Sequence, residues 1–511
     1  MRWITQPGWI GHVIALAAGG LTPLAFSPFD LWPLLLLSIA LFYLGLRTVS
    51  GRAAVARGWF YGFGVFAAGT SWVYVSIHDY GAASVPLALL LTEAFVAGLG
   101  LLFALLAWLW ARWLRSGTPL VDAVAFAALW VALEAFRGWF LTGFPWLFAG
   151  YSQLYGPLGS LAPLGGVWLL SFLLALSATL IVELARVRDS KLLLGTARLL
   201  LFTPWLVGLL LGGYSWTMPK GEPLSVVALQ GNVPQLLKWE PQQLNAQLAL
   251  YRDMTLDAPR ADLIVWPETA VPVLRHHVES YLAAMGAYAR ERGAALITGL
   301  PVRQPNAEGE LRYYNGLTSL GDGSGTYLKQ KLVPFGEYVP LQDVLRGLIE
   351  FFDLPMSDFA RGDADQPLLQ ARGYQLAPFI CYEVVYPEFA AGLAAQSDIL
   401  LTVSNDTWFG SSIGPLQHLQ MAQMRALEAG RWMIRATNNG VTALIDPFGR
   451  ISKQLPQFQQ ATLQGDVVPM QGLTPYLRWR GWPMALLVTG LLGWALYRRQ
   501  RLRSSLTPPR P

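Results

Sequence analysis

The sequence predicts a helical membrane domain joined to an α/β layered domain, and three observations indicate this fold class. Hydrophobic residues make up 53% of the 511 residues and charged residues only 14%, whereas a soluble protein carries about 25% charged residues. Apolar runs separated by short basic loops fill the N-terminal part of the chain. A long later stretch instead alternates short β-rich runs with helical patterns.

The apolar runs have the length of membrane-crossing helices, which need about 20 apolar residues. The first run follows Arg2 in the manner of a signal peptide. Because a second apolar run follows almost at once, we expect an uncleaved first span. The sequence thus predicts about eight transmembrane helices, over residues 9–26, 31–47, 58–77, 84–111, 119–136, 160–185, 199–216 and 481–497.

Basic residues alternate between the loops: they cluster after spans two, four, six and eight, whereas the loops after spans one and three hold none and the loop after span five holds only Arg137. Positively charged loops stay in the cytoplasm, so both chain ends are predicted to be cytoplasmic and residues 217–480 to lie on the opposite side. This use of the basic residues also explains the net charge of +5 without a nucleic-acid partner. The predicted domains are a membrane domain over 1–219, a catalytic domain over 220–470, a last span over 471–498 and a basic tail over 499–511.

Residues 220–470 have the pattern of buried strands with helices between them. The expected helices cover Glu279–Arg292 and Leu416–Ala429. The expected strands cover Ser225–Leu229, Leu263–Trp266, Ala295–Gly299, Leu376–Cys381 and Ile399–Ser404.

Reactive side chains stand at or near strand ends in this region. Glu268 follows Trp-Pro at the end of one strand, and Pro cannot continue a central ladder. Cys381, the only cysteine, ends another strand. Lys329 and Lys331 lie two apart in a strand-like stretch, so they would share one face.

A thiol, an amine and a carboxylate together suit covalent acyl transfer. A thiolate is the nucleophile, a carboxylate takes its proton, and an ammonium with a backbone N–H stabilises the oxyanion. Taken alone, each residue has a structural alternative: a buried cysteine, a helix-capping glutamate and a solvated edge lysine. No spacing of His, Cys or carboxylates predicts a metal site, and no glycine-rich phosphate loop is present, so no metal or cofactor is expected.

Longer motifs carry a resemblance to a known family. Trp-Pro-Glu, Tyr-x-Lys-x-Lys-Leu and Ile-Cys-Tyr-Glu occur in the order of the carbon–nitrogen hydrolase (nitrilase) superfamily, and the chain resembles in particular its apolipoprotein N-acyltransferase family. That family is also indicated by the strings at 231–239, 332–340 and 404–420. The resemblance implies a nitrilase-like αββα sandwich and a Glu-Lys-Cys triad made of Glu268, Lys329 and Cys381.

The implied reaction moves a fatty acyl group from a phospholipid, expected to be phosphatidylethanolamine, through a Cys381 thioester. The acceptor is the N-terminal amine of the S-diacylglyceryl cysteine of an apolipoprotein. The implied setting is a multi-pass monomer in the bacterial inner membrane, in contact with the lipid bilayer, with a periplasmic catalytic domain.

The resemblance also distributes the remaining roles. The Tyr-x prefix selects Lys329, and the role of Lys331 stays open. Glu337 would orient the lysine, and Tyr382 and Glu383 would shape the oxyanion site. Trp239 and Asn405 would line the substrate pocket. For Trp239, packing in the aromatic core is the structural alternative.

Two other functions share parts of this pattern. A membrane-tethered amidase of the nitrilase type would use the same triad on a small amide. A non-catalytic receptor or transporter would need few of these residues, but its transport path would carry charges inside the spans, and few are present. A separate prediction is that the apolar segment Leu345–Ala360 forms an arm that touches the bilayer.

Overall fold

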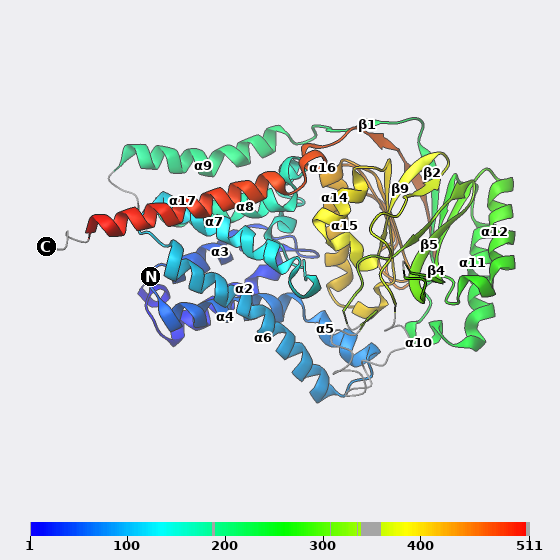
Figure 1. Cartoon of the computed structure of the whole chain (residues 1–511), viewed down its shortest axis with the longest axis horizontal. Coiled ribbons are helices and arrows are strands. Elements are labelled where there is room, and N and C mark those ends of the chain that lie inside the picture. The colour runs from blue at the N-terminus through cyan, green and yellow to red at the C-terminus, as the bar shows by residue number, and fades with distance from the viewer. Residues whose placement is uncertain (1, 187–189, 307, 335, 339–358, 507–511) are drawn as a thin grey trace. The chain divides into compact units, whose positions relative to one another are not determined.

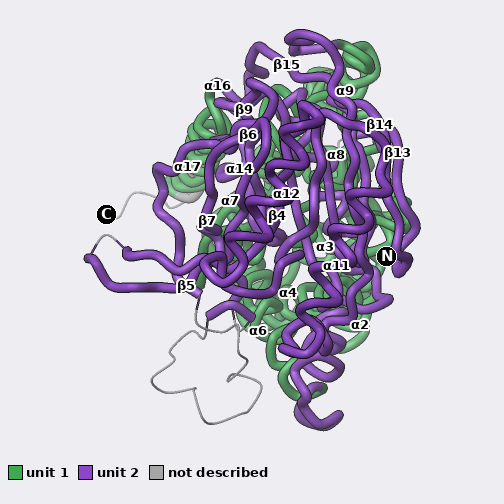
Figure 2. Tube along the Cα trace, turned by 90° about the vertical axis from the view of Figure 1, so that its right-hand side faces the viewer, with its two compact units in different colours: residues 1–71, 89–214, 479–511 green, residues 72–88, 215–478 purple. Residues whose placement is uncertain are grey.

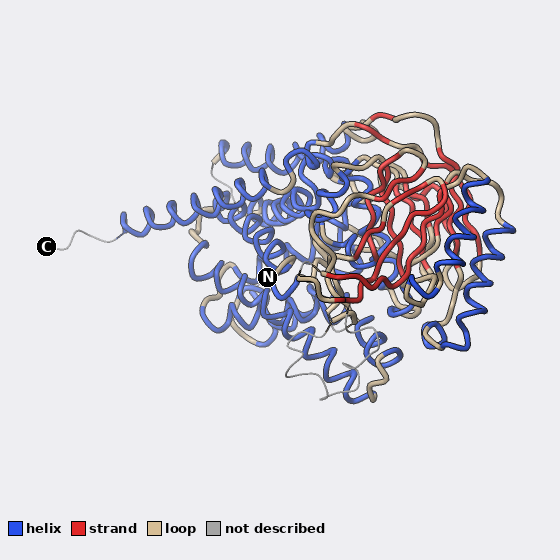
Figure 3. The backbone as a smooth tube through the Cα atoms, turned by 45° about the vertical axis from the view of Figure 1, so that its right-hand side comes forward, coloured by secondary structure: helices blue, strands red, loops and turns tan. Residues whose placement is uncertain are grey.

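The computed structural model describes residues 2–186, 190–306, 308–334, 336–338 and 359–506. The chain forms two compact units (Figure 2), the first made of Met1–Ser71, Leu89–Tyr214 and Trp479–Pro511, and the second of Trp72–Ala88 and Ser215–Arg478. All strands among the described residues belong to the second unit (Figure 3). The predicted arm over Leu345–Ala360 lies outside the described residues except for its last two positions.

The first unit is built from apolar helices, and glycines allow two of them to approach closely. A Cβ on Gly19 would lie 2.0 Å from the Tyr61 carbonyl oxygen, and one on Gly64 would lie 2.2 Å from the Leu16 carbonyl oxygen. Small residues at such contacts are typical of helices that pack in membranes. The long helices in or entering this unit are α2 (Trp9–Leu21), α3 (Pro33–Leu46), α4 (Gly51–Gly69), α6 (Val85–Leu109), α7 (Pro119–Arg137), α8 (Ala162–Leu184), α9 (Lys191–Leu210) and α17 (Trp482–Leu506).

Fewer helices are long and apolar enough to cross a membrane than the eight that the sequence predicts. Within the described ranges there are four, or five if the pair Gly51–Gly69 and Trp72–Tyr80, bent by 55°, is one span. The four are Val85–Leu114, Pro119–Arg137, Gly159–Leu184 and Lys191–Leu210. These helices make the chain a membrane protein, but the count of eight is not confirmed.

The missing spans have physical causes. The first two predicted spans form shorter apolar helices, over Trp9–Ala25 and Pro33–Leu46. Prolines at 23, 28 and 33 fall at their ends, where the absent N–H and fixed φ interrupt a helix. The last predicted span lies in α17, whose final turns carry arginines from residue 498 onward.

The second unit contains two large mixed sheets. The seven-stranded sheet has the order β13 (Ile451–Gln454), β12 (Ala443–Ile445), β11 (Met433–Thr437), β10 (Ile399–Ser404), β9 (Tyr374–Ile380), β8 (Leu369–Ala371) and β6 (Gly323–Ser324). The six-stranded sheet has the order β14 (Ala461–Val467), β2 (Leu224–Gln230), β3 (Leu263–Val265), β4 (Ala295–Pro305), β5 (Leu311–Gly321) and β7 (Thr326–Leu328). All five predicted strands and both predicted helices are confirmed.

The two sheets stack face to face between two helical layers (Figure 1). Alternation along β2 shows this: Val226 and Ala228 lie in the core between the sheets, whereas Val227 and Leu229 face α11 (Leu244–Asp257) and α12 (Glu279–Glu291). The period of two follows from the pleat of a strand. On the other side lie α14 (Pro387–Ala394) and α15 (Gly414–Ala429). The predicted αββα sandwich is confirmed.

Candidate active site

Glu268 is delivered at the end of β3 by Trp266-Pro267, as predicted. Its Oε1 accepts hydrogen bonds from Asn315 Nδ2 at 2.8 Å and Lys329 Nζ at 3.4 Å, and its Oε2 accepts one from the Asn405 backbone N–H at 2.8 Å. The carboxylate is therefore buried and fixed from three directions.

Lys329 follows the last residue of β7 and is buried. Its Nζ donates to Glu337 Oε1 at 2.8 Å in addition to Glu268. Burial lowers the pKa of this amine, but the charges of Glu337 and Glu268 outweigh burial and raise the pKa above its usual value. Lys329 is thus held as an ammonium ion between two carboxylates.

Lys331 is separated from this cluster. We predicted that both lysines share one face of a strand, and this is wrong because β7 ends at Leu328. The Lys331 side chain is exposed, and its Nζ lies 5.6 Å from the centre of the Tyr386 ring and 5.8 Å from that of Phe389. The irregular chain after β7 distinguishes the two amines, which a regular strand would have kept together.

Cys381 is the first residue after β9 and has a φ of 53°. This left-handed conformation costs a non-glycine residue on the order of 1–3 kcal/mol, and it turns the chain sharply at the nucleophile. Burial and the charge of Glu268 raise the pKa of the thiol, while Lys329 opposes them. A thiol with a raised pKa is protonated at rest, so a base must take its proton during attack.

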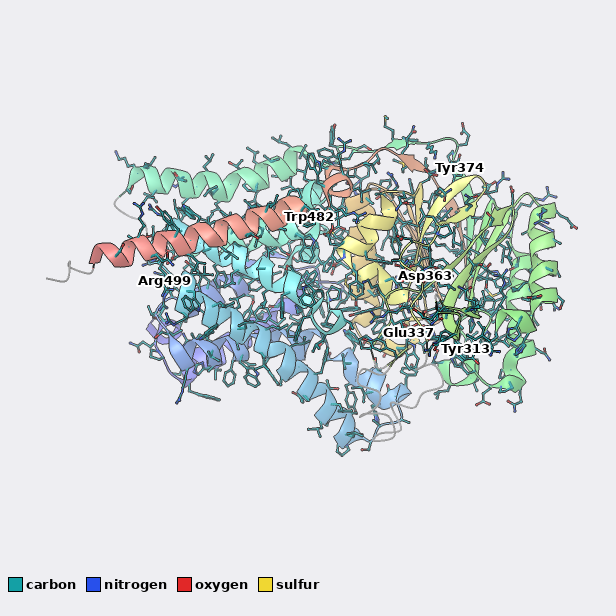
Figure 4. All side chains as sticks on the ribbon, viewed as in Figure 1. Tyr313, Glu337, Asp363, Tyr374, Trp482 and Arg499 are labelled. Atoms are coloured by element: carbon teal, nitrogen blue, oxygen red, sulfur yellow. The ribbon has the colours of Figure 1, made fainter. Side chains whose placement is uncertain are left out.

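Glu383 and Glu337 brace the two segments that carry the reactive groups. Glu383 Oε2 accepts the Ile380 N–H at 2.8 Å, and its Oε1 accepts the Gln330 N–H at 2.6 Å. Burial raises the pKa of Glu383 to about 7. Glu337 lies toward the lower ends of the sheets in Figure 4, where its Oε2 accepts the Val333 N–H at 2.9 Å.

The other predicted site residues differ in whether they contact the Glu268–Lys329 pair directly. Asn405 contacts Glu268 through its backbone, and its side chain donates to Gln235 Oε1 at 2.6 Å. Tyr382 is buried, with its ring centre 5.3 Å from that of Tyr386. Trp239 is half-buried at the end of α10 (Gln235–Lys238), and its indole N–H has no hydrogen-bond partner among the described residues.

Sequence reasoning missed three residues of the site. Asn315, on β5, joins the two carboxylates by donating to both Glu268 and Glu337. Lys238 is buried and its Nζ donates to the Glu268 carbonyl at 3.0 Å; burial lowers its pKa to about 8. Ser404 Oγ lies 3.6 Å from Cys381 Sγ. Lys238 and Ser404 begin or end motifs that indicated the family, whereas no pattern marks Asn315.

Within the described residues, no group of three or more His, Cys, Asp or Glu side chains is arranged to hold a metal ion. The cluster instead offers an acid–base group, a fixed cation and a thiol, which together suit covalent acyl chemistry.

Comparison with known proteins identifies related sequences. The family model described as "Apolipoprotein N-acyltransferase N-terminal domain" matches residues 18–180, and the one described as "Carbon-nitrogen hydrolase" matches residues 226–473. Three relatives named "Apolipoprotein N-acyltransferase" align along nearly their whole length. The one from Azotobacter vinelandii is 71% identical and covers 99% of both chains. The one from Pseudomonas aeruginosa PAO1 is 69% identical and covers 98% of both. The one from Vibrio vulnificus is 42% identical over 96% of this chain and 97% of its own.

Proposed function

Because the chain belongs to the apolipoprotein N-acyltransferase family, we propose that Cys381 carries a fatty acyl group from a phospholipid to the N-terminal amine of a diacylglyceryl lipoprotein. One observation carries this proposal: Ser404 Oγ lies 3.6 Å from Cys381 Sγ, and the N–H of the next residue, Asn405, donates to Glu268, whose other oxygen accepts from Lys329. The name of the relatives favours acyl transfer over the amidase and the receptor or transporter alternatives.

The first half of the reaction forms the thioester. Glu268 takes the thiol proton while Sγ bonds to the ester carbonyl carbon of the phospholipid. The Lys329 ammonium and the backbone N–H after Cys381 stabilise the tetrahedral oxyanion. The C–O ester bond then breaks, and the lysophospholipid oxygen leaves with the proton that Glu268 holds.

The second half transfers the acyl group. The free α-amine of the acceptor bonds to the thioester carbon, and Glu268 takes a proton from it. The C–S bond breaks, the amide is released, and the Cys381 sulfur recovers the proton from Glu268. Each half ends with the same protonation state in which it began, so one carboxylate serves both.

The finer assignments are part of the proposal. We infer phosphatidylethanolamine as the donor, a monomer, and a multi-pass position in the bacterial inner membrane with residues 220–470 in the periplasm. Membrane domains at 1–219 and 471–498 would hold the thiol near the bilayer surface, where both lipid-anchored substrates lie. The alternation of basic loops supports this orientation.

The test compares the two lysines in liposomes that contain phosphatidylethanolamine with a labelled acyl chain and a diacylglyceryl peptide acceptor. Lys329→Met should lower acyl transfer by about 10²–10³-fold, because it removes the cation that faces the oxyanion. Lys331→Met is the matched control, since Lys331 is exposed, and should transfer at the wild-type rate. Equal rates for both variants, or label that reaches water and never the peptide, would contradict the proposal.

A further inference from the structure

Four polar side chains lie behind the nucleophile and contribute no group to the proposed proton transfers. Ser404 ends β10, Asp406 opens the turn that follows it, His418 lies on α15 and Arg435 lies on β11. Each is at most 1% exposed. We refer to these four residues as the support cluster. A buried charged group is costly unless it is paired, so the retention of this cluster needs a reason.

The support cluster contacts Cys381 on two sides. His418 Nε2 lies 3.2 Å from the Cys381 carbonyl oxygen. A carbonyl only accepts, so the ring must carry a hydrogen on Nε2. Ser404 Oγ lies 3.6 Å from Sγ. The strand register explains this second contact, because Val403 pairs with Ile380 and the next residues are Ser404 and Cys381.

Asp406 and Arg435 together fix both of these contacts. Burial lowers the pKa of His418, and a neutral ring with its hydrogen on Nε2 accepts at Nδ1 from Arg435 Nη2, which lies 3.1 Å away. Asp406 Oδ1 accepts from Ser404 Oγ at 2.5 Å and lies 3.0 Å from His418 Nδ1. Its Oδ2 accepts from Arg435 Nη2 at 2.7 Å. Burial raises the pKa of Asp406, but Arg435 and His418 outweigh burial and hold the pKa below its usual range. The anchor of the support cluster therefore remains ionised.

The conformation of Cys381 supplies the reason for such support. Its φ of 53° is a backbone state that L residues rarely adopt and that persists only where surrounding groups impose it. If the carbonyl were released, the residue would relax toward an extended or right-handed helical conformation, and Sγ would turn away from Glu268 and Lys329. The His418 donor on the carbonyl and the Ser404 hydroxyl oxygen beside the sulfur are the contacts that prevent this.

We propose that His418 is a positioning residue for Cys381: together with Ser404, and anchored by Asp406 and Arg435, it holds the left-handed turn that aims Sγ at the acyl carbon. This inference rests on the proposed function, because it assigns these residues to the thioester-forming step. It does not require His418 to exchange a proton.

The experiment measures thioester formation on full-length protein in phosphatidylethanolamine liposomes, by intact mass against time and without acceptor. His418→Leu removes the donor to the carbonyl, whereas His418→Gln keeps an N–H at a similar reach. His418→Leu should slow acylation by about 10–100-fold, as expected for misplaced reacting atoms, and His418→Gln should recover most of the rate. Thermal unfolding of each variant gives the folded fraction by which its rate is corrected.

A second pair of variants covers the case in which His418→Leu does not fold. Ser404→Ala removes the hydroxyl beside Sγ. Thr402→Val is its matched control, because Thr402 lies two residues earlier on β10, is equally buried, and has no hydrogen-bond partner for its hydroxyl among the described residues. Ser404→Ala should slow acylation and Thr402→Val should not.

The outcomes separate this inference from the function on which it rests. If wild type forms the thioester and folded His418→Leu or Ser404→Ala forms it equally fast, the positioning role is wrong and the proposed function stands. If wild type forms no thioester at all, the proposed function fails and takes the inference with it. Slow acylation in His418→Leu with recovery in His418→Gln is the supporting result.

Discussion

At the scale of single residues, the site is a small set of charges enclosed by protein. Glu268 and Glu337 both bind Asn315 and Lys329, so two negative charges share one ammonium. In this low-dielectric setting the resting thiol of Cys381 stays neutral. The attack therefore depends on proton transfer within the cluster. Lys238 is a second buried amine. Burial lowers the pKa of its side chain to about 8, near physiological pH.

Lys238 provides a prediction about stability and pH. Its folded-state pKa of about 8 lies below its usual value of 10.5, so its buried charge costs stability below pH 8. As pH rises from about 8 to 10.5, the unfolded chain binds the proton and the folded chain does not, and stability rises. Lys238→Met should therefore have a higher Tm than wild type at pH 7, and the difference should narrow above pH 8. A Tm difference that is constant from pH 7 to 9.5 would contradict the burial of this charge.

At the scale of elements, strand ends bring the reactive groups together. The period-two pattern places Glu268 and Cys381 after buried strands, and the sequence is sufficient for both because each strand ends in a recognisable way. The same pattern fails for Lys329, since nothing in Tyr-x-Lys-x-Lys indicates that β7 stops at Leu328. Asn315 was missed for a different reason. It lies inside β5, and its role depends on the pairing of β5 with β7, which no local pattern encodes.

A glycine on β4 tests how closely these elements must approach. A Cβ on Gly299 would lie 2.4 Å from the Thr269 backbone nitrogen and 2.9 Å from Glu268 Cα. Gly299→Ala should therefore displace Glu268 and lower acyl transfer by about 100-fold, as a shift near 1 Å does at a reactive centre. The measurement is the transfer rate per folded molecule.

The matched control for Gly299 is another glycine of the same unit. A Cβ on Gly286, in α12, would meet its nearest atom, Leu320 Cβ, at an ordinary 3.5 Å. Gly286→Ala should keep full activity and gain roughly 0.5–1 kcal/mol of stability, because alanine favours the helix. Full activity in Gly299→Ala would show that Glu268 tolerates displacement and would contradict the close approach.

At the scale of the whole molecule, one chain combines apolar helices with an αββα unit that contains the buried ionisable residues of the candidate active site. Periodicity predicted the two kinds of region well, because apolar length and strand alternation are local properties. The number of spans was less predictable. Prolines shorten the first apolar helices, and composition alone does not show where each helix begins and bends. The arm predicted over Leu345–Ala360 lies largely outside the described residues.

The orientation of the chain gives a prediction at this scale. The basic residues after residue 497 predict that the C-terminus is cytoplasmic. A C-terminal green fluorescent protein fusion should therefore fluoresce, and a C-terminal alkaline phosphatase fusion should be inactive in cells. When the same reporters are instead fused after residue 307, within the predicted periplasmic domain, the green fluorescent protein should be dark and the alkaline phosphatase active. An active phosphatase at the C-terminus would contradict the predicted topology.

The central claim is that the Cys381 sulfur carries the fatty acyl group, as a thioester, between the phospholipid donor and the lipoprotein acceptor. The chain has a single cysteine, so intact mass spectrometry of the purified protein, after incubation with a phosphatidylethanolamine of defined acyl chain and no acceptor, tests this claim directly. We predict a mass increase of one acyl group that hydroxylamine removes, that maps to Cys381, and that Glu268→Gln and Cys381→Ser lack. An unmodified wild-type protein that nevertheless acylates the lipoprotein peptide would contradict the account.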